Sequence, residues 1–172
     1  MRLILFRHGP ASHRDPARWP DDAKRPVTRR GRERTARAAA GLQRLVGAAS
    51  RVASSPLVRA RQTAEVVVEA VAPEVKIETL DALAPGAPAR EILRWLRGLD
   101  SGANVILVGH EPHLGKVAGV LLFDSVAAQM PLKKAGALMI DFVGPVEPGA
   151  GRLVAFLPPR ALRRLARNGA GA

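Results

Sequence analysis

The sequence has 172 residues, a length typical of one domain that builds a core without disulfide staples. It contains no cysteine, which excludes a disulfide framework, a cysteine-bound metal and any enzyme that attacks with a cysteine thiolate. The net charge of +12 favours anionic partners, but with two Trp, four Phe and no Tyr the chain offers little stacking surface for single-stranded nucleic acid.

Apolar residues are distributed in short runs along the chain. None of these runs approaches the roughly 20 residues of a membrane span. The run at 3–6 is also far shorter than the apolar region of a signal peptide. We therefore expect a cytoplasmic protein that is not attached to a membrane.

Short apolar runs alternate with helical patterns from residue 2 onward. The predicted strands are residues 2–7, 51–54, 75–80, 104–108, 137–143 and 153–157. The predicted helices are residues 29–46, 56–71, 90–99, 112–122 and 159–167, and residues 10–28 are predicted to form a loop. The alternation predicts a single domain over 1–172, a three-layer α/β/α sandwich with a mostly parallel central sheet and a late antiparallel pair. We expect the Gly/Ala tail, 168–172, to be disordered.

Two of the helix starts carry capping residues. Thr28 precedes the first helix and is expected to cap it. Before the second helix, Ser54 and Ser55 are followed by Pro56, which predicts a serine cap with proline at the first helical position.

Histidines follow two of the predicted strands. Arg7, His8 and Gly9 end the first strand, and His110 and Glu111 follow the strand over 104–108. In open α/β sheets, ligands bind at the carboxyl ends of the strands, so these histidines are expected to lie near each other. Taken alone, either motif is equally compatible with a structural histidine in a turn.

A third unusual feature is the pair Arg59 and Arg61 near the start of the second helix. Cations there oppose the helix dipole by roughly 0.3–1 kcal/mol, and a bound anion offsets that conflict. The alternative is that one or both arginines face solvent.

Together the three features favour phosphoryl chemistry. Arginine forks match the oxygens of a phosphoryl group and stay charged at any working pH. A neutral imidazole is a good nucleophile toward phosphorus, and a second histidine can donate to a phosphoryl oxygen. Such a site needs no cofactor and no metal. The order His110-Glu111-Pro112-His113 is not the HExxH zinc pattern.

The same motifs resemble those of the histidine phosphatase (phosphoglycerate mutase-like) superfamily. RHG at 7–9, SPLVRARQTA at 55–64 and VGHEP at 108–112 occur in the order that this family shows. The small size of the chain and the Glu-Pro after its second histidine are most similar to the short SixA-type phosphohistidine phosphatases. The glutamate that larger branches carry after their third strand has no clear match here.

The resemblance implies a role for each site residue. His8 is the residue that becomes phosphorylated, and Arg7, Gly9, Arg59 and His110 bind the phosphoryl group. Glu111 occupies the place where another branch has an aspartate, so we expect it to act as the acid or base.

These observations predict a metal-independent phosphatase that works through a phosphohistidine intermediate on His8. The favoured substrate is a phosphohistidine-bearing protein, because a short chain leaves its site open to a macromolecule. The alternatives are a small-molecule phosphomonoesterase of the same superfamily, a non-catalytic phosphate-binding module, and a nucleic-acid binder driven by charge. The last alternative predicts an affinity for DNA or RNA that falls steeply as salt is raised and does not change when His8 is replaced. We expect neither a nucleic-acid nor a membrane partner, and the sequence leaves the oligomeric state open.

Overall fold

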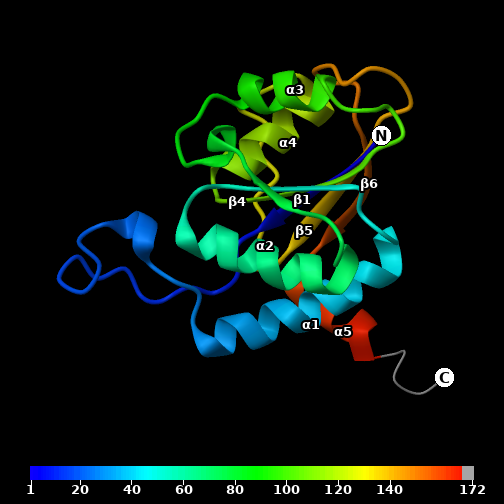
Figure 1. Ribbon diagram of the computed structural model, residues 1–172. Helices are drawn as coiled ribbons and strands as arrows, with labels where there is room; N and C mark the ends of the chain where they lie inside the picture. The colour runs from blue at the N-terminus through cyan, green and yellow to red at the C-terminus, as the bar shows by residue number, and fades with distance from the viewer. Residues whose placement is uncertain (168–172) are drawn as a thin grey trace.

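A six-stranded sheet lies at the centre of the protein in the computed structural model, which describes residues 1–167 (Figure 1). The strands are β1 (Arg2–Arg7), β2 (Arg51–Ser54), β3 (Ile77–Thr79), β4 (Asn104–Gly109), β5 (Ala137–Asp141) and β6 (Arg152–Leu157). Their order across the sheet is β3-β2-β4-β1-β5-β6. The tail at 168–172, for which we expected disorder, lies outside the described residues.

The pairing of the strands is mixed but mostly parallel. β1, β2, β3 and β4 run parallel to one another, whereas β5 runs antiparallel to both β1 and β6. β1 and β4 are neighbours, and Arg7 pairs with Gly109 at their carboxyl ends. Because β5 runs the opposite way, its first residue, Ala137, lies beside Phe6 at this same edge.

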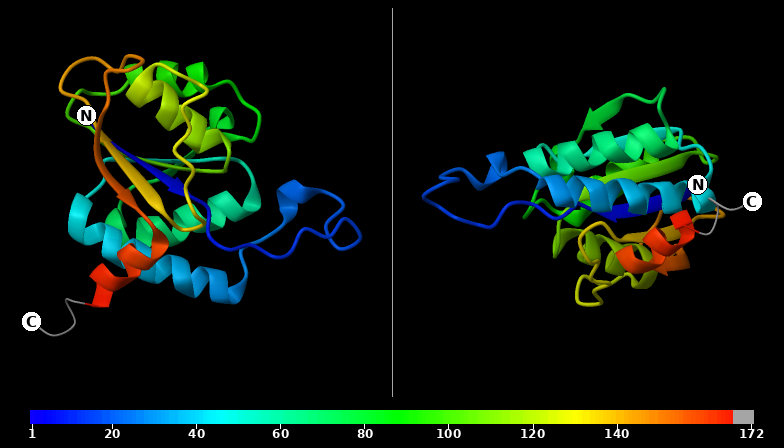
Figure 2. Two further views of the ribbon diagram at one scale, coloured as in Figure 1. Left: turned by 180° about the vertical axis from the view of Figure 1, so that it is seen from behind. Right: turned by 90° about the horizontal axis from the view of Figure 1, so that it is seen from below.

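Helices cover both faces of the sheet. The helices are α1 (Arg29–Val46), α2 (Val58–Val71), α3 (Ala89–Arg97), α4 (His113–Phe123) and α5 (Pro159–Arg167), with 3-10 turns at Asp22–Lys24 and Asp81–Leu83. Figures 1 and 2 show α1, α2 and α5 on one face and α3 and α4 on the other. Each layer packs on the sheet through its own buried apolar cluster. The predicted three-layer α/β/α sandwich is confirmed.

The first helix begins as its sequence predicts. Thr28 is extended, and its hydroxyl accepts a hydrogen bond from the Gly31 amide at 2.9 Å, which satisfies one of the free donors at the helix start. One face of α1 is buried, and Ala38, Ala39 and Leu42 lie on it. That face packs on the sheet, in one apolar cluster with Ile4 and Phe6 of β1.

The predicted start of the second helix is wrong by two residues. α2 begins at Val58, after Leu57, and no side chain caps it. The serine hydroxyls are used elsewhere: Ser54 donates to the Ser55 carbonyl, and Ser55 lies 2.8 Å from His110 Nε2. The Ser55 oxygen also accepts from the Leu57 amide at 3.4 Å, so it contacts the chain just before α2 begins.

Other element ends differ from the predictions by one or two residues. β3 and β5 are shorter than expected, and α3 ends at Arg97, two residues before the predicted end. The predicted loop over 10–28 contains a short 3-10 turn, Asp22–Lys24, and extends away from the sheet in both views of Figure 2. Within residues 1–167, no helix combines the length and apolar character that a membrane crossing requires.

Candidate active site

His8 and His110 lie side by side because their strands do. Each histidine is the first residue after a strand, at the pair Arg7 and Gly109. The His8 amide donates to the Gly109 carbonyl at 2.9 Å. The two ring centroids are 5.0 Å apart, with the rings tilted by 52°. Parallel pairing of β1 and β4 therefore brings together two residues that lie 102 positions apart in the sequence.

The backbone of Gly9 fixes the orientation of the His8 ring. Nδ1 of His8 lies 2.8 Å from the Gly9 carbonyl oxygen, which can only accept, so Nδ1 carries the proton. In the neutral ring, Nε2 is then left with its lone pair. The Gly9 amide itself donates to Thr63 Oγ1 at 2.9 Å, and a Cβ at Gly9 would lie only 2.2 Å from Thr35 Oγ1. Gly9 is thus packed tightly behind the histidine.

Both histidines are held in their neutral form. Burial lowers the pKa of His8 to about 4, with further contributions from Arg59, Arg7 and Lys134. Burial also lowers the pKa of His110 to about 3, helped by repulsion from His8 and Arg59. Their exposed fractions are 5% and 2%. At pH 7 the site therefore presents uncharged imidazoles among cationic side chains.

His110 has one ring nitrogen in a contact and one without a partner. Its Nε2 lies 2.8 Å from the Ser55 hydroxyl, whose oxygen also accepts from the Leu57 amide. When that hydroxyl donates to Nε2, the ring proton lies on Nδ1. His110 Nδ1 is buried and has no hydrogen-bond partner. Buried polar atoms are rarely left unpaired, so this nitrogen is suited to a bound group.

Arg59 is buried at the start of α2 and held by the loop before α1. Its Nη1 donates to the Asp22 carbonyl at 2.8 Å, and its Nη2 lies 3.1 Å from the Asp22 carboxylate. Only 6% of the side chain is exposed, and Nε has no hydrogen-bond partner. Arg61 points elsewhere: it donates to Thr79 at the end of β3. Of the two arginines that the sequence singled out, only Arg59 lies close enough to the two histidines for its charge to lower their pKa values.

Arg7 and Glu111 meet at a loop between α4 and β5. Arg7 Nη1 donates to the Leu132 carbonyl at 2.7 Å, and the Leu132 amide donates to the Glu111 carboxylate at 3.0 Å. Arg7 Nε is buried without a partner. Burial raises the pKa of Glu111 above its ordinary value, while Leu132 and Arg7 oppose that rise. Glu111 thus holds the same loop residue as Arg7.

The site collects more positive than negative charge. Arg7, Arg59, Arg25 and Lys134 lie around the two neutral histidines, and the two nearby carboxylates, Asp22 and Glu111, are already engaged. Unpaired N–H groups on buried cationic side chains are suited to a small oxyanion such as phosphate. Among residues 1–167, no three or more His, Cys, Asp or Glu side chains are arranged to hold a metal ion.

Comparison with known proteins agrees with this geometry. The family model described as histidine phosphatase superfamily, branch 1, matches residues 3–84. An uncharacterized protein of Picosynechococcus sp. is 38% identical over 141 residues, which cover 80% of this chain and 83% of that protein. The chain belongs to the histidine phosphatase superfamily. Its enzyme class, as the sequence predicted, is that of a phosphatase.

Solved structures of histidine phosphatases share the fold. The protein histidine phosphatase SixA, complexed with tungstate, has a TM-score of 0.81 at 24% identity, over 94% of this chain and 99% of its own. SixA of Agrobacterium tumefaciens has a TM-score of 0.73 at 23% identity, covering 92% and 97%. Phosphoserine phosphatase of Entamoeba histolytica, complexed with 3-phosphoglyceric acid, has a TM-score of 0.65 at 17% identity, covering 94% and 98%. The fold is therefore shared by enzymes with different substrates.

Sequence reasoning missed two cations of this phosphatase. Lys134 lies in the loop before β5, and its pKa is lowered by burial and by repulsion from Arg7, Arg25 and Arg59. Arg25, to which the sequence gave no role in catalysis, donates from Nε to Asp22 at 2.9 Å beside Arg59. A signal for Lys134 existed: the amino end of an antiparallel strand lies at the carboxyl edge of its parallel-running neighbours. Arg25 lies on the loop over 10–28, and it is the folded path of that loop that places Arg25 beside Arg59.

Proposed function

We propose that the protein is a metal-independent phosphohydrolase that transfers a phosphoryl group to His8 Nε2 and then to water. The hydrogen bond from His8 Nδ1 to the Gly9 carbonyl is the observation that carries this proposal, because it leaves the Nε2 lone pair free to attack. Gly9 acts by orienting the ring, since both of its polar backbone atoms are engaged within the protein.

In the first step, His8 Nε2 forms a bond to phosphorus while the bond from phosphorus to the leaving group breaks. Arg7, Arg59 and His110 donate to the phosphoryl oxygens, where charge is concentrated in the transition state. The support for these roles is the set of buried, unpartnered nitrogens: Nε of each arginine and Nδ1 of His110. The electron pair of the broken bond stays on the leaving group, which takes up a proton.

In the second step, water attacks phosphorus and the bond to His8 Nε2 breaks. The lone pair returns to Nε2, inorganic phosphate leaves, and the proton lost by water passes to a base. Glu111 is our proposed acid and base, because it is the carboxyl group next to His110 and burial raises its pKa, which favours its protonated form. In the alternative role, Glu111 only holds the Leu132 loop against Arg7.

For the substrate, we propose a phosphohistidine on a protein. An imidazole leaving group needs little help once it is protonated, which suits a site with a single candidate acid. The likeness to SixA supports this assignment at the level of the fold. The likeness to a phosphoserine phosphatase favours a second candidate, a small phosphomonoester.

Steady-state kinetics separates the two candidates. A phosphohistidine peptide and a panel of small phosphate esters are compared by kcat/KM, with EDTA present throughout. The proposal predicts a higher value for the peptide, and a small ester that exceeds it would make the phosphomonoesterase the correct assignment. Glu111→Gln should lower turnover of an alkyl phosphate ester, whose leaving group needs a proton most. Unchanged turnover would remove Glu111 as the acid.

A further inference from the structure

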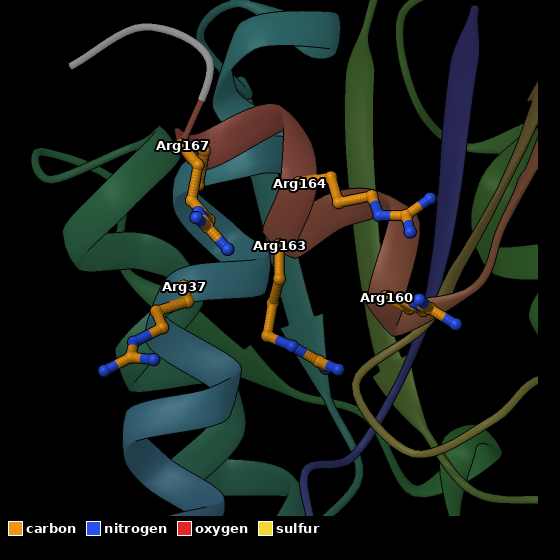
Figure 3. Close-up of a pocket in the computed structure, with 6 residues that line it drawn as sticks. Arg37, Arg160, Arg163, Arg164 and Arg167 are labelled. Atoms are coloured by element: carbon orange, nitrogen blue, oxygen red, sulfur yellow. The ribbon is translucent and has the colours of Figure 1, made fainter. Parts of the chain in front are cut away.

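Helix α5 presents four arginines and no acidic residue in its nine positions. Arg160, Arg164 and Arg167 are exposed, and Arg163 is half-buried. With Arg37 of α1 they line a cavity of about 680 Å³, to which Ala166 also contributes. Figure 3 shows Arg37 across from Arg163 and Arg167, while Arg160 and Arg164 project from the other flank of α5. We call these five residues the α5 arginine surface.

These arginines differ from the other unpaired surface cations of the chain in that they line one cavity together. Elsewhere Arg2 pairs with Asp141, Arg29 with Glu33, and Arg32 with Glu69. Within residues 1–167, no ion pair involves a member of the α5 arginine surface. Arginines three and four positions apart on one helix repel each other. An acidic partner would relieve this repulsion, so the arrangement is complementary to a run of negative charges.

The helix that carries most of the α5 arginine surface is packed closely against α1. Leu162 is fully buried beneath the helix, on the face opposite to the exposed arginines. Gly41 of α1 lies directly against it, so closely that a Cβ there would come within 1.9 Å of the Leu162 carbonyl oxygen. Figures 1 and 2 show α1 and α5 running side by side. The arginines therefore extend from a docked helix whose backbone position is set by packing.

The helix also begins next to the candidate active site. Ala135 donates its amide to the carbonyl oxygens of Arg7 and His8, and the Arg7 amide donates to the Gly136 carbonyl. A Cβ at Gly136 would lie 3.3 Å from Pro159, the first residue of α5. The loop that touches the His8 backbone thus also touches the start of α5. A chain whose phosphorylated side chain reaches His8 can extend over this helix.

We propose that the α5 arginine surface binds an acidic segment of the phosphoprotein substrate, beside its phosphorylated histidine. The inference rests on the proposed function and adds the chemistry of the partner. Guanidinium forks pair with carboxylates in two-pronged contacts. The lining has no aromatic ring on which nucleotide bases could stack and no large apolar side chain to enter a lipid layer.

The test uses two phosphohistidine peptides with the same core. One carries a run of glutamates on a flexible linker, and the other carries the same run as glutamines. Linker length is varied, because the gain from a tethered contact is greatest when the linker matches the distance between the sites. We expect the acidic tail to lower KM roughly tenfold in the wild type at low salt, and the gain to shrink as salt is raised.

Two matched variants remove the same amount of charge from different places. The test variant converts the α5 arginine surface to glutamine at Arg37, Arg160, Arg163, Arg164 and Arg167. The control variant converts five exposed cations outside it to glutamine, at Arg51, Lys76, Arg90, Arg94 and Arg152. The advantage of the acidic tail should be lost in the test variant and kept in the control. Arg37→Gln with Arg167→Gln changes only exposed side chains and serves if the larger variant does not fold.

A binding measurement keeps this inference separate from the proposed function. Fluorescence anisotropy of the unphosphorylated acidic peptide reports docking even if phosphohistidine is not hydrolysed. Equal loss of affinity in the two five-site variants would overturn the inference, since net charge alone would then account for binding. It would also be overturned if single-stranded RNA or phosphatidylglycerol vesicles bound this surface more tightly than the acidic peptide.

Discussion

The Nδ1 atom of His8 lies 2.8 Å from the carbonyl oxygen of the next residue, Gly9. That contact sets the tautomer of the ring and aims the other nitrogen away from the backbone. It depends on the absence of a side chain at Gly9, because Thr35 Oγ1 occupies the position that a Cβ would need. The predictions below follow from this arrangement and from the groups around it.

Gly9→Ala should lower kcat by roughly a hundredfold, because displacement of the Gly9 backbone moves the His8 ring out of line. Thr35→Ala in the same chain removes the oxygen that the new Cβ meets, so the double variant should recover part of the loss. Gly102→Ala is the control, since a Cβ there meets nothing within 4 Å. Steady-state kinetics on an aryl phosphate measures all of these variants. A double variant no better than Gly9→Ala would show that the contact with Thr35 does not matter.

Asp22→Asn should lower kcat/KM about tenfold, because the Asp22 carboxylate holds both Arg59 and Arg25. The guanidinium of Arg59 keeps its charge and its bond to the backbone carbonyl of residue 22 but loses its ion pair, so its direction is less firmly fixed, and preorganised charge is what stabilises a phosphoryl transition state. Asp100→Asn, at an exposed position, is the matched control. The kinetics should show the loss in kcat/KM for every substrate alike. Wild-type kinetics in Asp22→Asn would contradict this role of the carboxylate.

Acid should destabilise the fold through the histidines. The pKa of His8 is about 4 in the folded protein, against about 6.5 for an unfolded histidine. Between these values the unfolded chain binds more protons, so the free energy of unfolding falls as pH drops from 7 toward 4. His8 alone accounts for about 3 kcal/mol over this interval. His8→Asn should flatten the pH dependence measured by urea denaturation, and an unchanged slope would be evidence against a buried neutral His8.

The same low pKa of His8 predicts the pH below which the enzyme loses activity. His8 must be neutral to attack, so kcat/KM should persist through pH 5 and fall as the pH drops through about 4. An aryl phosphate is a suitable substrate if the pH profile is corrected for the ionisation of its phosphate group. A fall in kcat/KM centred near pH 6.5 would mean that His8 titrates as an exposed histidine.

Much of the fold could be predicted from local patterns. The short apolar runs and the Thr28 cap fixed β1, β4 and α1 to within a residue. The local pattern predicted the start of α2 two residues too early, and it gave no sign of the contact of Ser55 with His110 across 55 positions. Capping preferences describe residues close in sequence, so they do not predict long-range hydrogen bonds.

The candidate site was partly predictable for a similar reason. His8, Arg7 and His110 follow strands, and strand ends can be located from sequence. Lys134 and Arg25 lie on loops whose paths depend on tertiary contacts, such as the pairing of Asp22 with Arg59. Lys134 could be placed near the site only from the antiparallel strand expected after it, and Arg25 carries no pattern that distinguishes it from the many solvated cations of this chain.

Close packing of α5 on α1 gives a prediction about stability. Gly41→Ala would place a Cβ 1.9 Å from the Leu162 carbonyl oxygen, so the two helices must separate. We expect a loss of about 1–3 kcal/mol in the free energy of unfolding, as for other overpacked sites. Gly98→Ala, whose added Cβ would lie 3.4 Å from its nearest neighbour, is the control. Equal stability of the two variants in urea would mean that α5 is not held against α1.

The central claim is that His8 carries the phosphoryl group between the two steps. Rapid acid-free quenching of the enzyme with a phosphorus-labelled aryl phosphate, in the presence of EDTA, should trap a labelled protein. The label should be stable to base and labile to acid, as expected of a phosphohistidine, and peptide mass spectrometry should place it on His8. His8→Ala should give neither label nor turnover. Hydrolysis that continues in His8→Ala, or a label on another residue, would contradict the account.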